Sequence, residues 1–215
     1  MIIAIDGSAA SGKGTLARQL AEHFALSYLD TGALYRAVGL QLLSAYQESK
    51  NIDEFQCVKA CFELDIALTK SPLIRSEKVA EMASVVAAMP AVRAALLDVQ
   101  RQFAAAPPNP NGAILDGRDI GTVVLPDADI KFFIDADIHT RAKRRTKELL
   151  QAGQSVMFRD VLTYMQERDT RDRSRSAAPL RPADDAIIID TSTMDADEVV
   201  TMAMSYVTAW SGGTS

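Results

Sequence analysis

An apolar stretch that leads into a short glycine-rich turn constrains the fold of this chain more than any other feature. Residues 2–6, Ile-Ile-Ala-Ile-Asp, are typical of a buried strand, and the turn Gly7-Ser-Ala-Ala-Ser-Gly-Lys-Gly-Thr15 follows directly. A helical pattern begins at Lys13. The spacing from Gly7 to Lys13 is that of a Walker A loop, in which backbone N–H groups and a helix N-terminus surround phosphate oxygens. The sequence therefore predicts a phosphate-binding site here.

The residues of this loop have distinct expected roles. We expect Lys13 to reach the β- and γ-phosphates of ATP, and the Thr15 hydroxyl to lie towards Mg²⁺. Gly14 stands where many such loops have Ser or Thr directly after the lysine. The alternative, a glycine-rich turn with no ligand, is disfavoured by the lysine and its spacing. The predicted ATP-binding residues are Gly7, Ser8, Ala9, Ala10, Ser11, Gly12, Lys13, Gly14 and Thr15.

Five apolar segments are predicted strands, at residues 2–6, 27–29, 113–116, 130–135 and 186–190. Helical patterns fill most of the intervals, for example residues 13–24, 34–45, 79–88 and 92–105. Buried strands that alternate with helices predict an α/β fold, with a five-stranded parallel sheet and helices on both faces. In such sheets ligands bind beyond the carboxyl ends of the strands, where several of these segments run into an aspartate.

Two intervals are too long to be simple crossovers, and we interpret them as inserts that cover the carboxyl edge of the sheet. The first spans about residues 36–102 and the second about 138–179. We therefore expect a single domain over residues 1–215, with its core at about residues 1–35, 103–137 and 180–210.

Charge is distributed unevenly along the 215 residues, although the net charge is only −5. Residues 141–181 contain eleven Lys/Arg against five Asp/Glu, so this stretch is basic within an acidic chain. Such a pattern suits a small polyanion such as a nucleotide better than a nucleic acid. No apolar run is long enough to span a bilayer, and residues 1–6 lack the basic leader of a signal peptide.

The two cysteines, Cys57 and Cys61, lie four residues apart in a helical pattern, and the histidines His23 and His139 are isolated. We interpret the cysteines as two thiols on a helix and not as a metal site, because further ligands are missing. Free thiols suit the cytoplasm.

The second predicted strand leads into Leu-Asp30-Thr31-Gly-Ala-Leu-Tyr-Arg36. Arg36 is suited to bind the phosphate of an acceptor, because its planar guanidinium can donate two parallel hydrogen bonds. The alternative is an ordinary helix start, with Thr31 as N-cap and an outward arginine. Local sequence leaves the two interpretations open.

The third predicted strand ends in Asp116-Gly-Arg118-Asp119-Ile-Gly121. We expect Asp116 to hold a water of hydrated Mg²⁺, Arg118 to face phosphate and Asp119 to accept from an amino group. A surface turn with a local salt bridge is the alternative, which its position after a buried strand disfavours.

The basic stretch Glu167-Arg-Asp-Thr-Arg-Asp-Arg-Ser-Arg175 has the pattern of a helix. At 100° per residue, Arg168, Arg171, Asp172 and Arg175 fall on one stripe. Like charges on one helix face repel, so the stripe is interpreted as a phosphate clamp, to which Arg141, Arg144 and Arg145 could contribute. The alternative is a solvated, salt-bridged helix.

Together these segments resemble the cytidylate kinases of bacteria over nearly the whole chain. The match rests on the Gly-Lys-Gly-Thr loop, the segment from Leu29 to Arg36, Ala83-Ser84 with residues 90–93, the segment from Asp116 to Val124, and residues 167–173. The resemblance implies a monophosphate-binding insert at residues 36–102 and a lid at residues 138–179. It implies transfer of the γ-phosphate of ATP to CMP or dCMP, with Mg²⁺ and in line, and we expect a monomer.

The resemblance also implies roles for particular residues. It places Ser84, Arg93 and Asp119 around the cytosine, and it places Asp30, Thr31, Arg36, Arg118, Arg168, Asp172 and Arg175 around the sugar and phosphate. The expected catalytic residues are Lys13, Arg118, Arg168, Asp172 and Arg175, and the expected metal-binding residues are Thr15 and, through water, Asp116.

Two features depart from the family pattern, and two other functions compete. Ser8 stands where the family often has proline. The stretch of residues 65–75 is short, so a small sheet in the insert is not expected.

A kinase for another acceptor, such as UMP or a non-nucleotide alcohol, is the rival within enzymes. The rival outside them is a P-loop switch that binds ATP without an acceptor.

Overall fold

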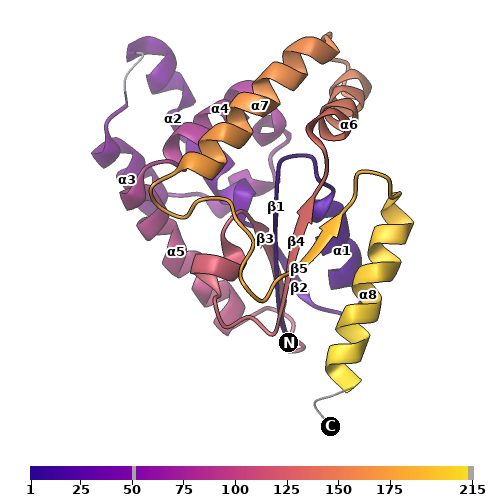
Figure 1. Ribbon diagram of the computed structural model, residues 1–215. Helices are drawn as coiled ribbons and strands as arrows, with labels where there is room; N and C mark the ends of the chain where they lie inside the picture. The colour runs from indigo at the N-terminus through magenta and orange to yellow at the C-terminus, as the bar shows by residue number, and fades with distance from the viewer. Residues whose placement is uncertain (50–51, 213–215) are drawn as a thin grey trace. The chain divides into compact units, whose positions relative to one another are not determined.

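One sheet organises the part of the chain that the computed structural model describes, residues 1–49 and 52–212. Five strands belong to it over those residues (Figure 1), namely β1 (Ile2–Gly7), β2 (Ser27–Asp30), β3 (Ala113–Gly117), β4 (Ile130–Asp135) and β5 (Ile187–Asp190). Their order is β2-β3-β1-β4-β5, and β1 pairs in parallel with both β3 and β4, as β4 does with β5. The predicted five-stranded parallel sheet and its α/β class are confirmed.

The core of the sheet follows from its register. Ile3 and Ile5 of β1 lie opposite Ile130 and Phe132 of β4, so these side chains share one face. Helices α1 (Lys13–His23) and α8 (Ala196–Gly212) cover this face and complete one apolar cluster (Figure 1). Both faces of the central strands are buried, which is why their sequences are mainly apolar, with Lys131 of β4 as an exception.

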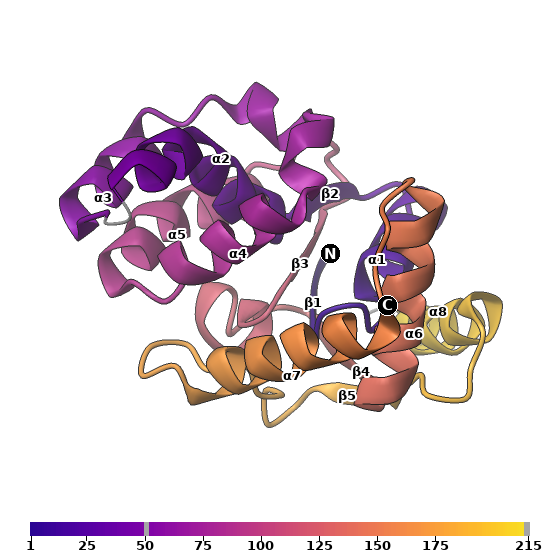
Figure 2. The same ribbon diagram turned by 90° about the horizontal axis from the view of Figure 1, so that it is seen from above.

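Helices α6 (Ile138–Gln151) and α7 (Phe158–Ser174) lie beyond the carboxyl ends of β1 and β4 (Figures 1 and 2). They pack against each other through a small cluster that includes Ala142, Leu149, Val161 and Met165. Asp137 is the N-cap of α6, and its carboxylate accepts from the backbone N–H groups of His139 and Thr140. The basic stretch is therefore helical, as predicted.

The chain divides into two compact units, Met1–Tyr28 with Pro107–Ser215, and Leu29–Ala106. The second unit consists of α2 (Thr31–Ser49), α3 (Glu54–Phe62), α4 (Glu77–Val86), α5 (Pro90–Ala105) and two short 3₁₀ helices, η1 (Ile66–Lys70) and η2 (Pro72–Arg75). Its own core includes Leu34, Val38, Met82 and Leu96. The short stretch around residues 65–75 thus forms the two 3₁₀ helices, which Asp65 and Ser71 cap.

Among the described residues, no single helix is both long and apolar enough to cross a membrane. One pair, α4 with α5, passes that test only when the two are joined across a bend of 100°.

Candidate active site

The glycine-rich loop between β1 and α1 has a backbone that side chains would obstruct. A Cβ atom at Gly7, which has a φ of 156°, would lie 2.0 Å from the carbonyl oxygen of Ile134. Gly12 precedes α1 with a left-handed φ of 96°, a conformation that residues with side chains rarely adopt. The glycines at these two positions therefore serve the turn itself, and the loop delivers Lys13 to the first position of α1.

Side chains from distant elements hold this loop in place. Arg141 Nη1 on α6 donates to the carbonyl oxygen of Ala9 at 3.3 Å, and Thr191 Oγ1, after β5, donates to the carbonyl oxygen of Ser11 at 3.0 Å. Arg144 Nη1 donates in turn to Thr191 Oγ1 at 2.9 Å. These bonds satisfy the carbonyl oxygens of Ala9 and Ser11, so side chains of other elements fix the loop in the protein alone.

Gly14 lies against a carboxylate of β3. A Cβ atom there would be 3.1 Å from Asp116 Oδ2, which also accepts from the Tyr28 hydroxyl at 3.0 Å. A carboxylate oxygen thus lies beside the position where many phosphate-binding loops carry Ser or Thr, and a side chain at Gly14 would require Asp116 to shift by a few tenths of an ångström. Within residues 1–49 and 52–212, no three His, Cys, Asp or Glu side chains are grouped to hold a metal ion. A divalent ion would need phosphate oxygens in addition to Asp116 and the exposed Thr15.

Asp172 of α7 is the centre of a charge cluster. Its carboxylate accepts from Arg118 Nε at 3.0 Å and from Arg175 Nη2. Burial alone would raise the pKa of Asp172, but the guanidinium groups of Arg118, Arg175 and Arg168 outweigh it and hold the pKa below its ordinary value. The turn after β3 and the basic helix, which are more than 50 residues apart in sequence, therefore present their arginines together.

Arg141 of α6 is buried and bonded to carbonyl and carboxylate oxygens. It is 2% exposed, donates to Asp169 through Nη1 at 3.2 Å and Nη2 at 2.5 Å, and donates to the carbonyl oxygen of Ala136 through Nε at 2.8 Å. Arg144 bonds to Thr191, and Arg145 pairs with Glu148. Arg141 and Arg144 therefore support the phosphate loop and the segment after β5 in this structure, and the suggested contribution of the three arginines to a phosphate clamp stays a prediction.

In the second unit, Asp30 links the start of α2 to Arg36. Its Oδ1 accepts from the backbone N–H of Ala33 at 3.0 Å, and its Oδ2 accepts from Arg36 Nη2 at 2.7 Å. Asp30 therefore caps α2, and the interpretation of Thr31 as the N-cap is wrong, because α2 begins at Thr31 itself. The same carboxylate orients the guanidinium of Arg36.

Ser84 and Arg93 lie on neighbouring helices of this unit. The Ser84 hydroxyl of α4 is buried and has no hydrogen-bond partner among the described residues. Arg93 of α5 donates to the carbonyl oxygen of Ala87 at 3.2 Å, and its guanidinium lies over the Tyr35 ring of α2, 5.6 Å from the centroid. A buried hydroxyl without a partner is costly, which is consistent with a group that awaits a ligand.

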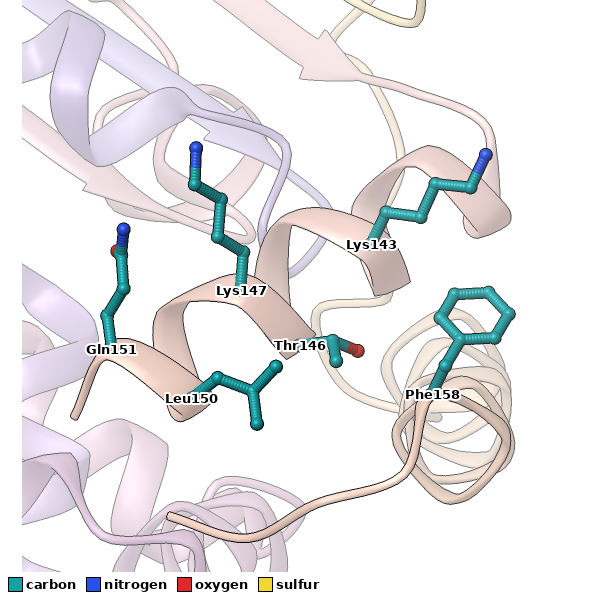
Figure 3. A pocket seen from close by; sticks show the side chains of 6 residues that line it. All are labelled: Lys143, Thr146, Lys147, Leu150, Gln151 and Phe158. Carbon is teal, nitrogen blue, oxygen red and sulfur yellow. The ribbon is translucent and has the colours of Figure 1, made fainter. Parts of the chain in front are cut away.

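Other candidate features carry no sign of a site. Cys57 and Cys61 are free and buried on α3, burial raises the pKa of Cys61 to about 11, and its thiol donates to the Cys57 carbonyl oxygen at 3.2 Å. They are two thiols on a helix, as predicted. An open groove on α6 and the start of α7 (Figure 3) has no candidate site residue in its lining, which is formed by Lys143, Thr146, Lys147, Leu150, Gln151 and Phe158.

A parallel sheet, a Gly-Lys-Gly-Thr loop at the end of its first strand and an arginine-rich helix beyond the strand ends define the P-loop nucleoside monophosphate kinase class. A solved structure of an uncharacterized protein from Eubacterium ventriosum ATCC 27560 shares the fold. Its TM-score is 0.54 at 18% identity, with 96% of this chain and 98% of that chain covered.

Sequence comparison narrows the class to one family. The model of the Cytidylate kinase family matches residues 3–209. A relative named cytidylate kinase from Rhodopseudomonas palustris (strain BisB18) is 51% identical, with 99% of this chain and 98% of the relative covered. Another relative of that name, from Paramagnetospirillum magneticum (strain ATCC 700264 / AMB-1), is 49% identical, with 96% and 97% covered. The chain belongs to the cytidylate kinase family.

The charge cluster predicts how stability depends on pH. Because the folded pKa of Asp172 lies below the unfolded value of 3.8, its ion pairs stabilise the fold above about pH 4, and this stabilisation is lost as the pH falls through the folded pKa. Arg118→Ala leaves a buried carboxylate with less compensation, so we expect the free energy of unfolding at pH 7 to fall by about 1.5–3 kcal/mol. Urea denaturation at several pH values measures this, and the loss should shrink below about pH 4.

Arg173→Ala is the matched control. Arg173 Nη2 pairs with Asp135 at 3.2 Å, but the arginine side chain is 55% exposed, so its loss should cost about 0–1 kcal/mol. Equal losses in the two variants at pH 7 would contradict the special role of the buried pair.

Proposed function

We propose that this chain transfers the γ-phosphate of ATP to CMP and dCMP, with Mg²⁺, and forms CDP and dCDP. The observation that carries the proposal is the extent of the family match, because residues 3–209 include every candidate site residue and not the phosphate loop alone. The relatives' printed name, cytidylate kinase, points to cytidylate as the acceptor. The reaction belongs to pyrimidine nucleotide metabolism in the cytoplasm, where free thiols such as Cys57 and Cys61 persist.

On the donor side, residues 7–15 bind the phosphates of ATP through their backbone N–H groups, and Lys13 neutralises the transferred group. Thr15 and, through water, Asp116 would hold Mg²⁺, which would supply positive charge to the phosphate oxygens. The donor set of carboxylate and hydroxyl oxygens fits this hard cation. The contact of Asp116 with Gly14 supports the assignment, since it brings an acid next to the residue after Lys13.

On the acceptor side, Asp30, Thr31 and Arg36 are assigned to the sugar and phosphate of CMP, and Asp30 orients the Arg36 guanidinium. Arg118, Arg168, Asp172 and Arg175 are assigned to the same groups of CMP. Ser84, Arg93 and Asp119 recognise the cytosine. The buried hydroxyl of Ser84 and the fixed guanidinium of Arg93 support this assignment.

Catalysis then consists of positioning and charge neutralisation. Phosphoryl transfer passes through a loose transition state whose charge is spread over equatorial oxygens, so guanidinium groups and Lys13 stabilise it without a general base. Residues 138–179 act as a lid over a core of residues 1–35, 103–137 and 180–210, and residues 36–102 act as the CMP-binding insert. The chain functions as a monomer and binds neither nucleic acid nor membranes, in keeping with its net charge of −5.

An acceptor panel tests the function. ADP release with ATP and Mg²⁺ should depend on CMP or dCMP and should exceed the release with UMP, AMP or shikimate by at least about ten-fold. Equal or better use of UMP would replace the cytosine assignment. ATP binding without acceptor-dependent ADP release would support a nucleotide switch instead.

Lys13→Ala should reduce acceptor-dependent ADP release by about a hundred-fold or more, because the phosphate loop loses its only side-chain cation for the transferred group. Lys59→Ala, which removes a lysine that is 61% exposed on α3, is the control and should retain the rate. Comparable activity of the two variants in the coupled assay would remove Lys13 from the donor site.

Asp119→Ala should raise the Michaelis constant for CMP by about ten-fold or more and leave that for ATP within about three-fold. Asp119 is 5% exposed, whereas Asp127, a few residues further along, is exposed. Asp127→Ala is therefore the matched control. Unchanged use of CMP by Asp119→Ala would exclude this carboxylate from cytosine recognition.

A further inference from the structure

Asp6, the residue before the phosphate loop, holds a distant turn through both of its carboxylate oxygens. Oδ1 accepts from the backbone N–H of Ile120 and Oδ2 from that of Gly121, each at 2.8 Å. The Asp6 residue is 3% exposed. These two amides directly follow Arg118 and Asp119 and open η3 (Ile120–Val124), a short π-helical segment.

The first N–H groups of a helical segment need acceptors, and a side chain at its start usually supplies one. Asp119 occupies that position before η3 but makes no capping hydrogen bond there. The carboxylate of Asp6, more than 110 residues earlier in the chain, supplies both acceptors instead. The direction in which the turn presents Arg118 and Asp119 therefore depends on a residue of β1.

We propose that Asp6 is a positioning residue for acceptor recognition, whose carboxylate fixes the turn that carries Arg118 and Asp119. The inference rests on the proposed binding of CMP by those two residues. Asp6 would then connect the proposed binding sites of CMP and ATP, because β1 continues from Asp6 directly into the phosphate loop at Gly7.

The surroundings of Asp6 suit a fixed acceptor and not an ion pair. Lys131 of β4 passes close by, since its Cδ would lie 3.1 Å from a Cβ atom on Gly121, but Lys131 Nζ bonds to both oxygens of Asp185 at 2.9 and 2.8 Å. Burial raises the pKa of Asp6 to about 7, Asp119 adds to this, and the two backbone N–H bonds and Arg118 oppose it. Stabilisation of the Asp6 carboxylate thus comes chiefly from the turn that it holds.

Asp6→Asn tests the proposal with nearly unchanged volume. An amide retains one acceptor oxygen, and its NH₂ group cannot accept from the second backbone N–H. We expect kcat/KM for CMP to fall by about ten-fold or more, while the dissociation constant for ATP changes by less than about three-fold. Hydrogen–deuterium exchange of the segment containing residues 120 and 121 should become faster in the variant.

Asp129→Asn is the matched control, because Asp129 Oδ2 accepts from the backbone N–H of Ile2 at 2.7 Å, at the other end of β1. It should leave both substrates and the exchange of residues 120–121 unchanged. An Asp6→Asn variant that behaves like this control, or that loses ATP and CMP equally, would overturn the proposal. Failure of the unaltered protein to phosphorylate CMP would instead contradict the proposed function.

Gly121→Ala keeps the test decisive if Asp6→Asn does not fold. Its added methyl group would lie 3.1 Å from Lys131 Cδ, so Lys131 or the backbone of the turn must shift by a few tenths of an ångström beside the Asp6 carboxylate. Faster exchange of residues 120–121 with a selective loss of CMP use supports the positioning role, and faster exchange with normal use of CMP refutes it.

Discussion

The close approach of Gly7, at the end of β1, to the backbone of β4 is the constraint on which the candidate site depends. Gly7 passes so near to the carbonyl oxygen of Ile134 that a methyl group would lie 2.0 Å from it. This approach lets β1 continue into the phosphate loop without leaving the sheet, between β3 on one side and β4 on the other. Both neighbouring strands end at the same edge, so Asp116 lies beside Gly14 of the loop, and α6 and α7 follow β4 in the chain.

Ion pairs with aspartates fix the positions of several arginines in the first unit. Asp172 binds Arg118 and Arg175, and Asp169 binds the buried Arg141. A buried guanidinium needs a partner at all times, and in the protein alone the Asp172 carboxylate supplies one to Arg118 and Arg175. Arginines that are already oriented lose less side-chain entropy when an anion binds than arginines that are disordered in water. The interleaved aspartates of the basic stretch are thus compatible with a phosphate clamp, although they suggested a solvated helix as the alternative.

The sequence predicted the sheet and the loop because both depend on local patterns. Continuous apolar runs identified the strands, and the spacing of Gly7 and Lys13 identified the turn between β1 and α1. The start of α2 was predicted too late, at residue 34, because its cap is Asp30 and not Thr31. The bonds of Asp6 with Ile120 and of Arg141 with Asp169 join residues far apart in the chain, so no pattern of spacing announces them. A buried aspartate at the end of an apolar strand was the one available signal for Asp6.

The identity of the acceptor base, like the bonds of Asp6 and Arg141, depends on contacts and cannot be predicted from spacing patterns in the sequence. Neither glycine spacing nor arginine stripes distinguish CMP from UMP, because both nucleotides carry the same phosphate and sugar. The two bases differ at position 4, where cytosine has an amino donor and uracil a carbonyl acceptor. In the proposed role, the Asp119 carboxylate would accept a hydrogen bond from the amino group of cytosine and would face an acceptor in uracil. The same side chain would then favour CMP and disfavour UMP. That discrimination requires the carboxylate to be held in place, because an aspartate free to turn away would tolerate either base.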